Sequence, residues 1–394
     1  MDLSVTHLLL NAIGIVLIAK WIKQQFVDYK TIQNKSDYFS FKRFKNIGFV
    51  FLVIFTPIFL INFTSLEDYL HLTKEVVSKN NTYFALLVSF LISMVWFIYI
   101  LKLDIFNKEK KRHLIIIFVL SIFFTSLTDI PYSFIHEVGF RNSASLFPSF
   151  MYSVFGIGLI EETIKLIPLL LILKFTKAID EPYDYILYAS VSALGFAFVE
   201  NAMYLKTYGL EIINGRALYA TVAHMTFSSI LAYGLFLNKF KQSKTNPVVL
   251  FLLFYFLAIF SHGFYDFWLI NKTASNFSGI TTFFLLVIIH VWFSIKNNTI
   301  NASNYYTATK MIHNDRLKVY LVFALLSIFM LSYVYVAFKV NSDKANNFLM
   351  ESTFVYGYIL FYLIATLTKF NLVEGLLTPI KVRLGNIIPK KRVY

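Results

Sequence analysis

The chain contains no cysteine and few charged residues. None of its 394 residues is cysteine, and only 15% are Asp, Glu, Lys or Arg, whereas soluble globular proteins have about 25%. The missing cysteine excludes disulfides, thiolate metal sites and a cysteine nucleophile. Together with 57% hydrophobic residues and a mean hydropathy of +0.63, the low charge excludes a soluble enzyme, a disordered chain and a fibrous one. These values indicate a polytopic membrane protein.

Long apolar segments recur along the chain. A helix that crosses the hydrocarbon core of a bilayer needs roughly 20 mostly apolar residues. Eleven segments meet this requirement, at residues 3–19, 47–66, 82–101, 113–131, 148–173, 185–206, 217–238, 247–270, 277–295, 319–339 and 348–368. The sequence therefore predicts an all-α polytopic membrane protein with about eleven transmembrane helices.

The basic residues fall mainly on one side of these predicted spans. With the N-terminus outside, 27 of the 36 Lys and Arg residues lie in cytoplasmic segments and 8 in outer segments, while Lys165 lies inside a span. Cytoplasmic loops of membrane proteins carry such an excess, so the bias predicts an N-out, C-in orientation. The same bias explains the net charge of +14, because the basic residues lie in short loops beside the lipid bilayer. No nucleic-acid partner is therefore predicted.

Ionisable residues inside the spans are concentrated in the fifth to eighth spans. An ionisable side chain in the membrane is costly and marks a functional site by default. In the fifth span, Glu161 and Lys165 are four residues apart and share a helix face, and Glu162 is three residues from Lys165. An ion pair that only holds helices together would account for Lys165 and one glutamate, but not for the second glutamate.

The next three spans carry further polar pairs. Glu200 lies in the sixth span, His224 and Ser228 are one turn apart in the seventh, and His262 and Asp266 are one turn apart in the eighth. Each also has a simpler interpretation. Glu200 could be a protonated carboxyl that is hydrogen-bonded to a neighbour, and His224 could bond a backbone carbonyl. His262 and Asp266 could be a polar pair near a helix end. Their similar depths on consecutive spans instead favour one shared site in the outer half of the membrane.

The residue types in this set suit amide hydrolysis. Catalytic zinc has three protein ligands and a water, and Glu200, His224 and His262 could supply those ligands. Bound zinc lowers the pKa of its water to about 7, and Glu161 or Glu162 would act as the general base. In a metal-free version, a glutamate activates water directly and the two histidines stabilise the oxyanion. The sequence leaves both versions open.

Four further residues are expected to support this chemistry, namely Lys165, Asn201, Ser228 and Asp266. Lys165 should pair with one of the two glutamates, Asp266 should orient His262, and Asn201 could bond the substrate backbone. The familiar hydrolase motifs are missing, because His136-Glu137 is not continued to a zincin HExxH pattern and no GxSxG sequence occurs.

Four motifs in this order resemble the PrsW family of intramembrane proteases, which is similar to the wider CPBP/Abi group of CAAX proteases. The motifs are Glu161-Glu162-x-x-Lys165, Phe196-x-x-x-Glu200-Asn201-x-x-Tyr204, His224-x-x-x-Ser228 and His262-x-x-x-Asp266. The stretches Asp180-Glu181-Pro182-x-Asp184 and Arg216-Ala217 also resemble this family. The resemblance covers residues 148–270, about a third of the chain.

The resemblance implies roles for these residues. It makes Glu161 and Glu162 the catalytic carboxylates, and Glu200, His224 and His262 the metal ligands or polarising groups. It also implies a membrane-anchored protein substrate, of the anti-sigma-factor kind, cleaved near the outer face of the membrane.

The resemblance also suggests a division of the chain. A catalytic membrane core over 148–270 would lie between a four-helix extension over 1–147 and a three-helix region with a cytoplasmic tail over 271–394. The expected location is the cytoplasmic membrane of a bacterium. The competing interpretation is a proton- or cation-coupled transporter, or an inactive binding relative, because carboxylates and histidines inside a bundle also form proton relays.

Overall fold

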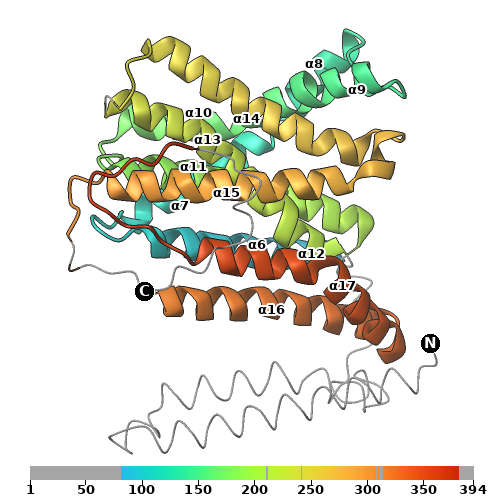
Figure 1. The fold of residues 1–394 in the computed structure, drawn as a ribbon. Coiled ribbons are helices and arrows are strands. Elements are labelled where there is room, and N and C mark those ends of the chain that lie inside the picture. The colour runs from blue at the N-terminus through green and yellow to red at the C-terminus, as the bar shows by residue number, and fades with distance from the viewer. Residues whose placement is uncertain (1–80, 210–211, 241, 308, 310–313, 381–394) are drawn as a thin grey trace, which may run out of the picture. The chain divides into compact units, whose positions relative to one another are not determined.

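The computed structural model describes residues 81–209, 212–240, 242–307, 309 and 314–380. The predicted spans at 3–19 and 47–66 lie outside these ranges. Within them every regular element is a helix (Figure 1). The α-helices are α6 (Asn81–Leu103), α7 (Lys111–Thr125), α8 (Asp129–Glu137), α9 (Leu146–Met151), α10 (Leu159–Phe175), α11 (Pro182–Tyr208), α12 (Ile213–Gly215), α13 (Thr221–Lys239), α14 (Pro247–Ile270), α15 (Gly279–Asn301), α16 (Asn314–Lys339) and α17 (Ser342–Leu367).

Three other helical segments interrupt or connect these elements. Two are π-helices, η1 (Tyr152–Gly158) and η3 (Arg216–Ala220), and one is the 3₁₀-helix η4 (Ala274–Phe277). Because η1 joins α9 to α10, and η3 joins α12 to α13, each forms part of a longer helical segment.

The prediction of a polytopic all-α membrane protein is confirmed. In the described part of the chain, eight helical segments are long and apolar enough to cross a membrane. The run of α9, η1 and α10 adds a further helical segment over residues 146–175. Each of the nine spans predicted after residue 80 coincides with one of these segments, and α14 has the predicted limits of 247–270.

The fourth predicted span differs from the observed helices. It was expected to continue over 113–131, but α7 ends at Thr125 and α8 begins at Asp129. Pro131 accounts for the break, since proline has no amide hydrogen and is tolerated only in the first turn of a helix. The chain therefore starts a new helix that has Pro131 in its first turn.

The described residues fall into two compact units, one that contains residues 326–355 and one that contains the described residues of 82–325 and 356–380. In the described part of the first unit, the hydroxyl of Tyr333 in α16 donates to Oδ1 of Asn346 in α17, at 2.8 Å. The second unit contains all the candidate site residues, including the whole predicted core of 148–270. The predicted domain limits at 147 and 271 stay predictions.

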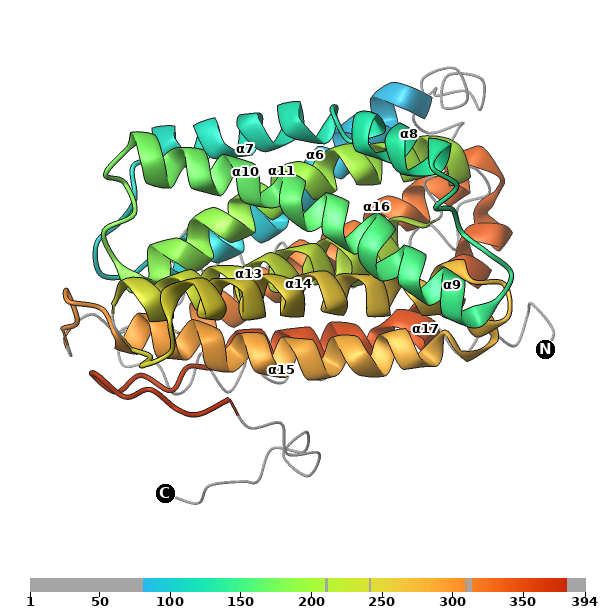
Figure 2. The ribbon, with the colours of Figure 1, turned by 90° about the horizontal axis from the view of Figure 1, so that it is seen from above.

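In the second unit, α11 and α13 are the interior helices. Helix α11 packs against α7 and α13, and α13 packs against α14 and α15. Figure 2 shows these helices from above. In the most apolar 18 residues of the segment Ile213–Lys239, which contains α13, 89% of the residues are buried, compared with 39% in α14. Polar side chains on α11 and α13 are therefore shielded by other helices, as the free-energy cost of exposing them to lipid requires.

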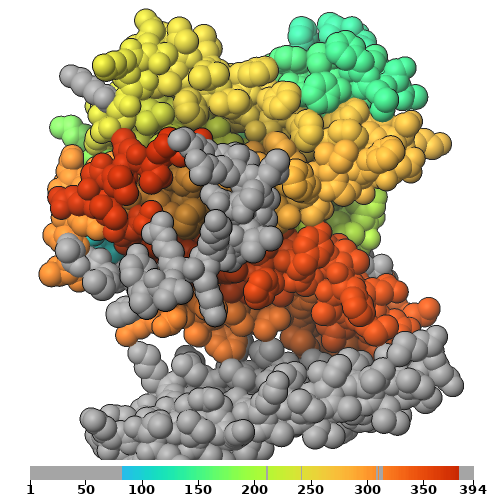
Figure 3. Space-filling view, viewed as in Figure 1, coloured from blue at the N-terminus to red at the C-terminus, as the bar shows by residue number. Residues whose placement is uncertain are grey.

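A segment after α17 is fastened to the end of α15 (Figure 3). Oδ1 of Asn301 accepts from the amide of Val373 at 3.0 Å, and Oδ1 of Asn298 accepts from the amide of Thr378 at 2.9 Å. The side-chain amides of the same two asparagines donate to carbonyls of this segment. The side chains of Asn298 and Asn301 thus provide the hydrogen bonds that hold this non-helical segment on α15.

Candidate active site

A close helix crossing brings the fifth and eighth predicted spans together. A Cβ added at Gly158 would lie 2.5 Å from the carbonyl oxygen of Ile259 in α14, and one added at Gly263 would lie 2.4 Å from Cα of Val154 in η1. Only glycine allows backbones to approach this closely, as at helix contacts in membranes. The crossing places His262 of α14 beside the two glutamates at the start of α10.

The two adjacent glutamates have different surroundings. Glu162 is 1% exposed and its carboxylate is fully engaged. Its Oε1 lies 2.8 Å from Nζ of Lys165 and 2.8 Å from Nδ1 of His262, and its Oε2 accepts from the hydroxyl of Ser228 at 2.9 Å. Glu162 therefore links α10, α13 and α14, and it is not among the residues that line the pocket.

Glu161 faces a pocket instead. Its Oε1 accepts from the hydroxyl of Tyr132 at 3.1 Å, and its Oε2 lies 3.4 Å from Nε2 of His262 and 3.5 Å from Nζ of Lys165. These two Oε2 contacts are long, and the carboxylate lines the pocket. Of the two candidate bases that the sequence left open, Glu161 is the one a water molecule could reach.

Lys165 lies at the centre of the cluster. In addition to both glutamates, its Nζ contacts Nδ1 of His224 at 2.9 Å and Nδ1 of His262 at 3.4 Å. The ammonium also lies over the ring of Phe196, 4.3 Å from the centroid. The side chain is 2% exposed, so one buried cation offsets two buried carboxylates, as such charges require.

Each histidine is oriented by a carboxylate. Nε2 of His224 donates to Oε2 of Glu200 at 2.7 Å, and Nε2 of His262 lies 3.3 Å from Oδ2 of Asp266. Such partners fix the tautomer and the ring direction of a catalytic or metal-bound histidine. The expected contact between Asp266 and His262 is thus present in the structure.

Glu200 is held by an arginine that belongs to the second π-helix. The guanidinium of Arg216 pairs with Glu200 and donates to Oδ1 of Asn201 at 2.6 Å. The same guanidinium lies 4.2 Å from the ring centroid of Tyr204. Asn201 is fully buried and also donates to Thr221 at 2.9 Å. Asn201 therefore positions Arg216, and the structure does not place it where the expected contact with a substrate backbone would occur.

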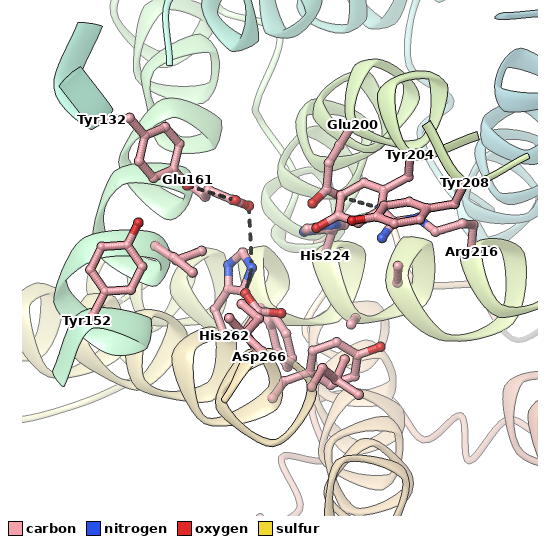
Figure 4. Close-up of a pocket in the computed structure, with 17 residues that line it drawn as sticks. Tyr132, Tyr152, Glu161, Glu200, Tyr204, Tyr208, Arg216, His224, His262 and Asp266 are labelled. Atoms are coloured by element: carbon pink, nitrogen blue, oxygen red, sulfur yellow. Dashed lines mark hydrogen bonds and ion pairs between the residues drawn. The ribbon is translucent and has the colours of Figure 1, made fainter. Parts of the chain in front are cut away.

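These residues surround a pocket of about 600 Å³ (Figure 4). Glu161, Glu200, His224, His262 and Asp266 line it, so side chains from α10, α11, α13 and α14 converge as the sequence predicts. Four tyrosines and an arginine that the motifs did not assign to the site complete the polar wall, namely Tyr132, Tyr152, Tyr208, Tyr265 and Arg216. With 25 tyrosines in the chain, no sequence signal separates these four from the rest.

A metal-compatible group is present, but its members differ from the predicted set. Ligand atoms of Glu161, His224 and His262 lie within 4.8 Å of one another. The predicted ligand Glu200 is instead paired with Arg216 and oriented on His224. In this structure Glu161 is therefore the carboxylate that lies with the two histidines, and Glu200 as a metal ligand stays a prediction. Two imidazoles and one carboxylate are the donor types of catalytic zinc sites.

Comparisons with known proteins agree with this geometry. Residues 109–294 match the model of the family described as "PrsW family intramembrane metalloprotease". Over this range the chain is similar to the PrsW family. The matched range includes every residue that lines the pocket. The match confirms the resemblance that was inferred from the four motifs.

Individual relatives point the same way. A protein named Protease PrsW from Oceanobacillus iheyensis is 36% identical over 143 residues, which are 35% of this chain and 63% of the relative. Proteins of the same name from Shouchella clausii and Bacillus subtilis are 28% and 33% identical, over 44% and 30% of this chain and 78% and 54% of the relatives. The chain thus spans less than two thirds of the first of these relatives. No solved structure matches.

Proposed function

We propose that the chain is an intramembrane peptidase that hydrolyses a peptide bond of a membrane-anchored protein. The observation that carries the proposal is the convergence of Glu161, His224 and His262 on one pocket inside a bundle of apolar helices. Hydrolysis within a membrane needs water and polar groups there, and the pocket supplies the polar wall. The PrsW-family segment supports the same activity.

In this proposal Glu161 is the group that takes a proton from water. The oxygen of that water attacks the carbonyl carbon of the scissile amide, and the proton passes through Glu161 to the leaving nitrogen. Tyr132 donates to Oε1 of Glu161 and leaves Oε2 directed at His262. The His262 ring, which Glu162 and Asp266 hold in place, is positioned to donate to the oxyanion.

A metal ion fits the same residues. Glu161, His224 and His262 would hold it, and Glu200 would keep His224 correctly oriented through Nε2. Zinc, the metal we propose, would polarise the carbonyl and acidify a bound water. A metal at Nδ1 of His224 would displace the hydrogen bond from Lys165, because that nitrogen has a single lone pair and now accepts from the lysine.

The substrate and location follow from the same proposal. The expected substrate is a single-span protein of the anti-sigma-factor kind, and the expected location is the cytoplasmic membrane of a bacterium. Residues 1–147 and 271–394 would flank the core of 148–270 and influence the choice of substrate.

The proposal is tested with purified full-length protein and a fluorescent single-span substrate in proteoliposomes. A Glu161→Gln variant should lose cleavage by at least about a hundredfold, and should unfold at the wild-type temperature because the side chain keeps its shape. Asp315→Asn, which removes an exposed carboxylate elsewhere, is the matched control and should cleave normally. Normal cleavage by Glu161→Gln would contradict the proposed role.

Metal analysis of the same samples separates the two versions of the chemistry. About one zinc per wild-type chain, lost in a His224→Ala, His262→Ala double variant, would establish the metal-bound version. Full cleavage by metal-free protein would establish the version in which Glu161 acts alone on water.

A further inference from the structure

Five carboxylates gather at the opposite end of the helices from the pocket. They lie in two connections, between α6 and α7 and between α10 and α11, and at the start of α11. The five are Asp104, Glu109, Asp180, Glu181 and Asp184. Asp184 and Glu200 are 16 residues apart on α11, about 24 Å along the helix axis, so this cluster takes no part in the proposed hydrolysis.

The carboxylates are close enough together to share an ion. One oxygen from each of Asp104, Glu181 and Asp184 lies within 4.8 Å of the other two, and the same holds for Glu109, Asp180 and Asp184. Asp184 belongs to both groups. Asp104, Glu181 and Asp184 are 4%, 2% and 0% exposed, which is rare for carboxylates unless they are paired.

One buried oxygen in the cluster has no partner. Oδ2 of Asp184 accepts from the amides of Asp180 and Glu181, at 3.0 and 2.7 Å. Oδ1 of the same side chain is buried and has no hydrogen-bond partner in the described part of the chain. Leaving a buried polar atom unpaired costs free energy, so an unpaired oxygen in a native structure needs an explanation, and a bound ion among the carboxylates supplies one.

Four of the five carboxylates lack a basic partner in the part of the chain that the structure describes. In the described ranges, none of Glu109, Asp180, Glu181 and Asp184 forms an ion pair with lysine, arginine or histidine. The carboxylates of Asp104, Glu181 and Asp184 therefore lie close together as like charges that repel one another. A cation among these oxygens would remove that repulsion.

We propose that the cluster binds a hard divalent cation, Mg²⁺ or Ca²⁺, with Asp104, Glu181 and Asp184 as the inner ligands and Glu109 and Asp180 at the rim. A set made only of oxygens is the donor set that these two ions prefer. The ion would tie the α6–α7 connection to the α10–α11 connection. Contacts between them already exist, because the amide of Asn107 donates to Oε2 of Glu181 at 3.2 Å. The distribution of basic residues predicts that this end is cytoplasmic.

The proposal is tested by thermal unfolding of chelator-treated full-length protein in detergent, with MgCl₂ or CaCl₂ added in separate titrations. The wild-type midpoint should rise and saturate, by roughly 5 °C or more at a hundredfold excess of ion over its dissociation constant. The ion that acts at the lower concentration is the preferred one. Asp184→Asn should abolish the rise, whereas Asp315→Asn should keep it.

Two further variants keep the test decisive. His262→Ala removes a proposed ligand of the pocket but should keep the full rise, which separates this site from the proposed peptidase site. If Asp184→Asn fails to fold, Glu109→Gln replaces it, and bound Mn²⁺ counted by electron paramagnetic resonance should bind at least tenfold more weakly than in Asp315→Asn. An equal rise in wild type, Asp184→Asn and Glu109→Gln, or no rise with either ion, would overturn the proposal.

Discussion

Lys165 contacts both glutamates and both histidines of the candidate site. The ammonium group of Lys165 is therefore a positive charge that four polar side chains of the site contact, and it offsets the two buried carboxylates. A buried ion pair that loses one partner leaves an uncompensated charge, and this costs about 3–5 kcal/mol of folding free energy.

We expect Lys165→Met to lower the midpoint of thermal unfolding by roughly 5–10 °C. The physical reason is that Glu162 would keep its buried charge without its closest cation. Unfolding of the detergent-solubilised protein, followed by circular dichroism, measures the change.

Lys296 offers a matched control for this prediction. It is also a fully buried lysine, but its described contacts are the carbonyl of Lys369 and the rings of Trp292, Phe293 and Phe370. Lys296→Met removes a hydrogen bond and strands no carboxylate, so its effect should be the smaller one. A larger loss in Lys296→Met than in Lys165→Met would refute this account.

At the residue scale, the sequence predicted what helical spacing controls. The four-residue spacing from Glu161 to Lys165 and from His262 to Asp266 put each pair on one helix face, and the structure has both contacts. The spacing rule says nothing about contacts between helices. The sequence predicts Glu200 as a metal ligand, but nothing in the sequence shows that Arg216 reaches this carboxylate from the next helical segment.

At the scale of elements, the crossing of η1 and α14 positions the site. Gly263 packs directly on the backbone of Ser153 and Val154, with no room for a side chain. His262 directly precedes Gly263, so any shift of this crossing also moves the imidazole of a candidate catalytic residue.

We expect Gly263→Ala to destabilise the fold by about 1–3 kcal/mol, because the added methyl group would overlap backbone atoms that cannot rotate away. Cleavage should fall with it. Gly279→Ala is the control, since a Cβ at Gly279 meets nothing within 4 Å. Unfolding midpoints and cleavage rates of the two variants, compared side by side, test the prediction, and equal values for both would contradict it.

The elements themselves were largely predictable, because a membrane span must be apolar and long. Helix α14 matched its prediction at both ends. The two π-helices were not predictable, since an extra residue in a helical turn leaves the hydropathy of the segment unchanged. Both precede candidate site residues, Glu161 and His224, and such local widening of a helix is frequent at functional sites.

At the scale of the whole molecule, the two ends of the helix bundle should face opposite sides of the membrane. Tyr208 lies at the end of α11 near the pocket and is 64% exposed, and Lys177 is exposed in the connection before α11. The distribution of basic residues puts the first outside and the second in the cytoplasm.

The absence of cysteine makes this orientation measurable without background. In intact cells, a membrane-impermeant thiol reagent should label Tyr208→Cys and leave Lys177→Cys unlabelled. In inside-out vesicles the two results should be exchanged. Labelling of Lys177→Cys in intact cells would reverse the predicted topology.

The glycine crossing also restricts how a peptide could enter from the lipid. Two backbones in direct contact have no side chains that can move aside, so η1 and α14 cannot separate at Gly158 and Gly263 without disrupting the bundle. Helix α8 is different, because none of its nine residues is buried, although Tyr132 reaches Glu161 from it. Displacing α8 would therefore disturb the least buried surface of the pocket wall. An outward movement of α8 would open the pocket laterally to the lipid, and it would also remove the hydrogen bond from Tyr132 to Glu161.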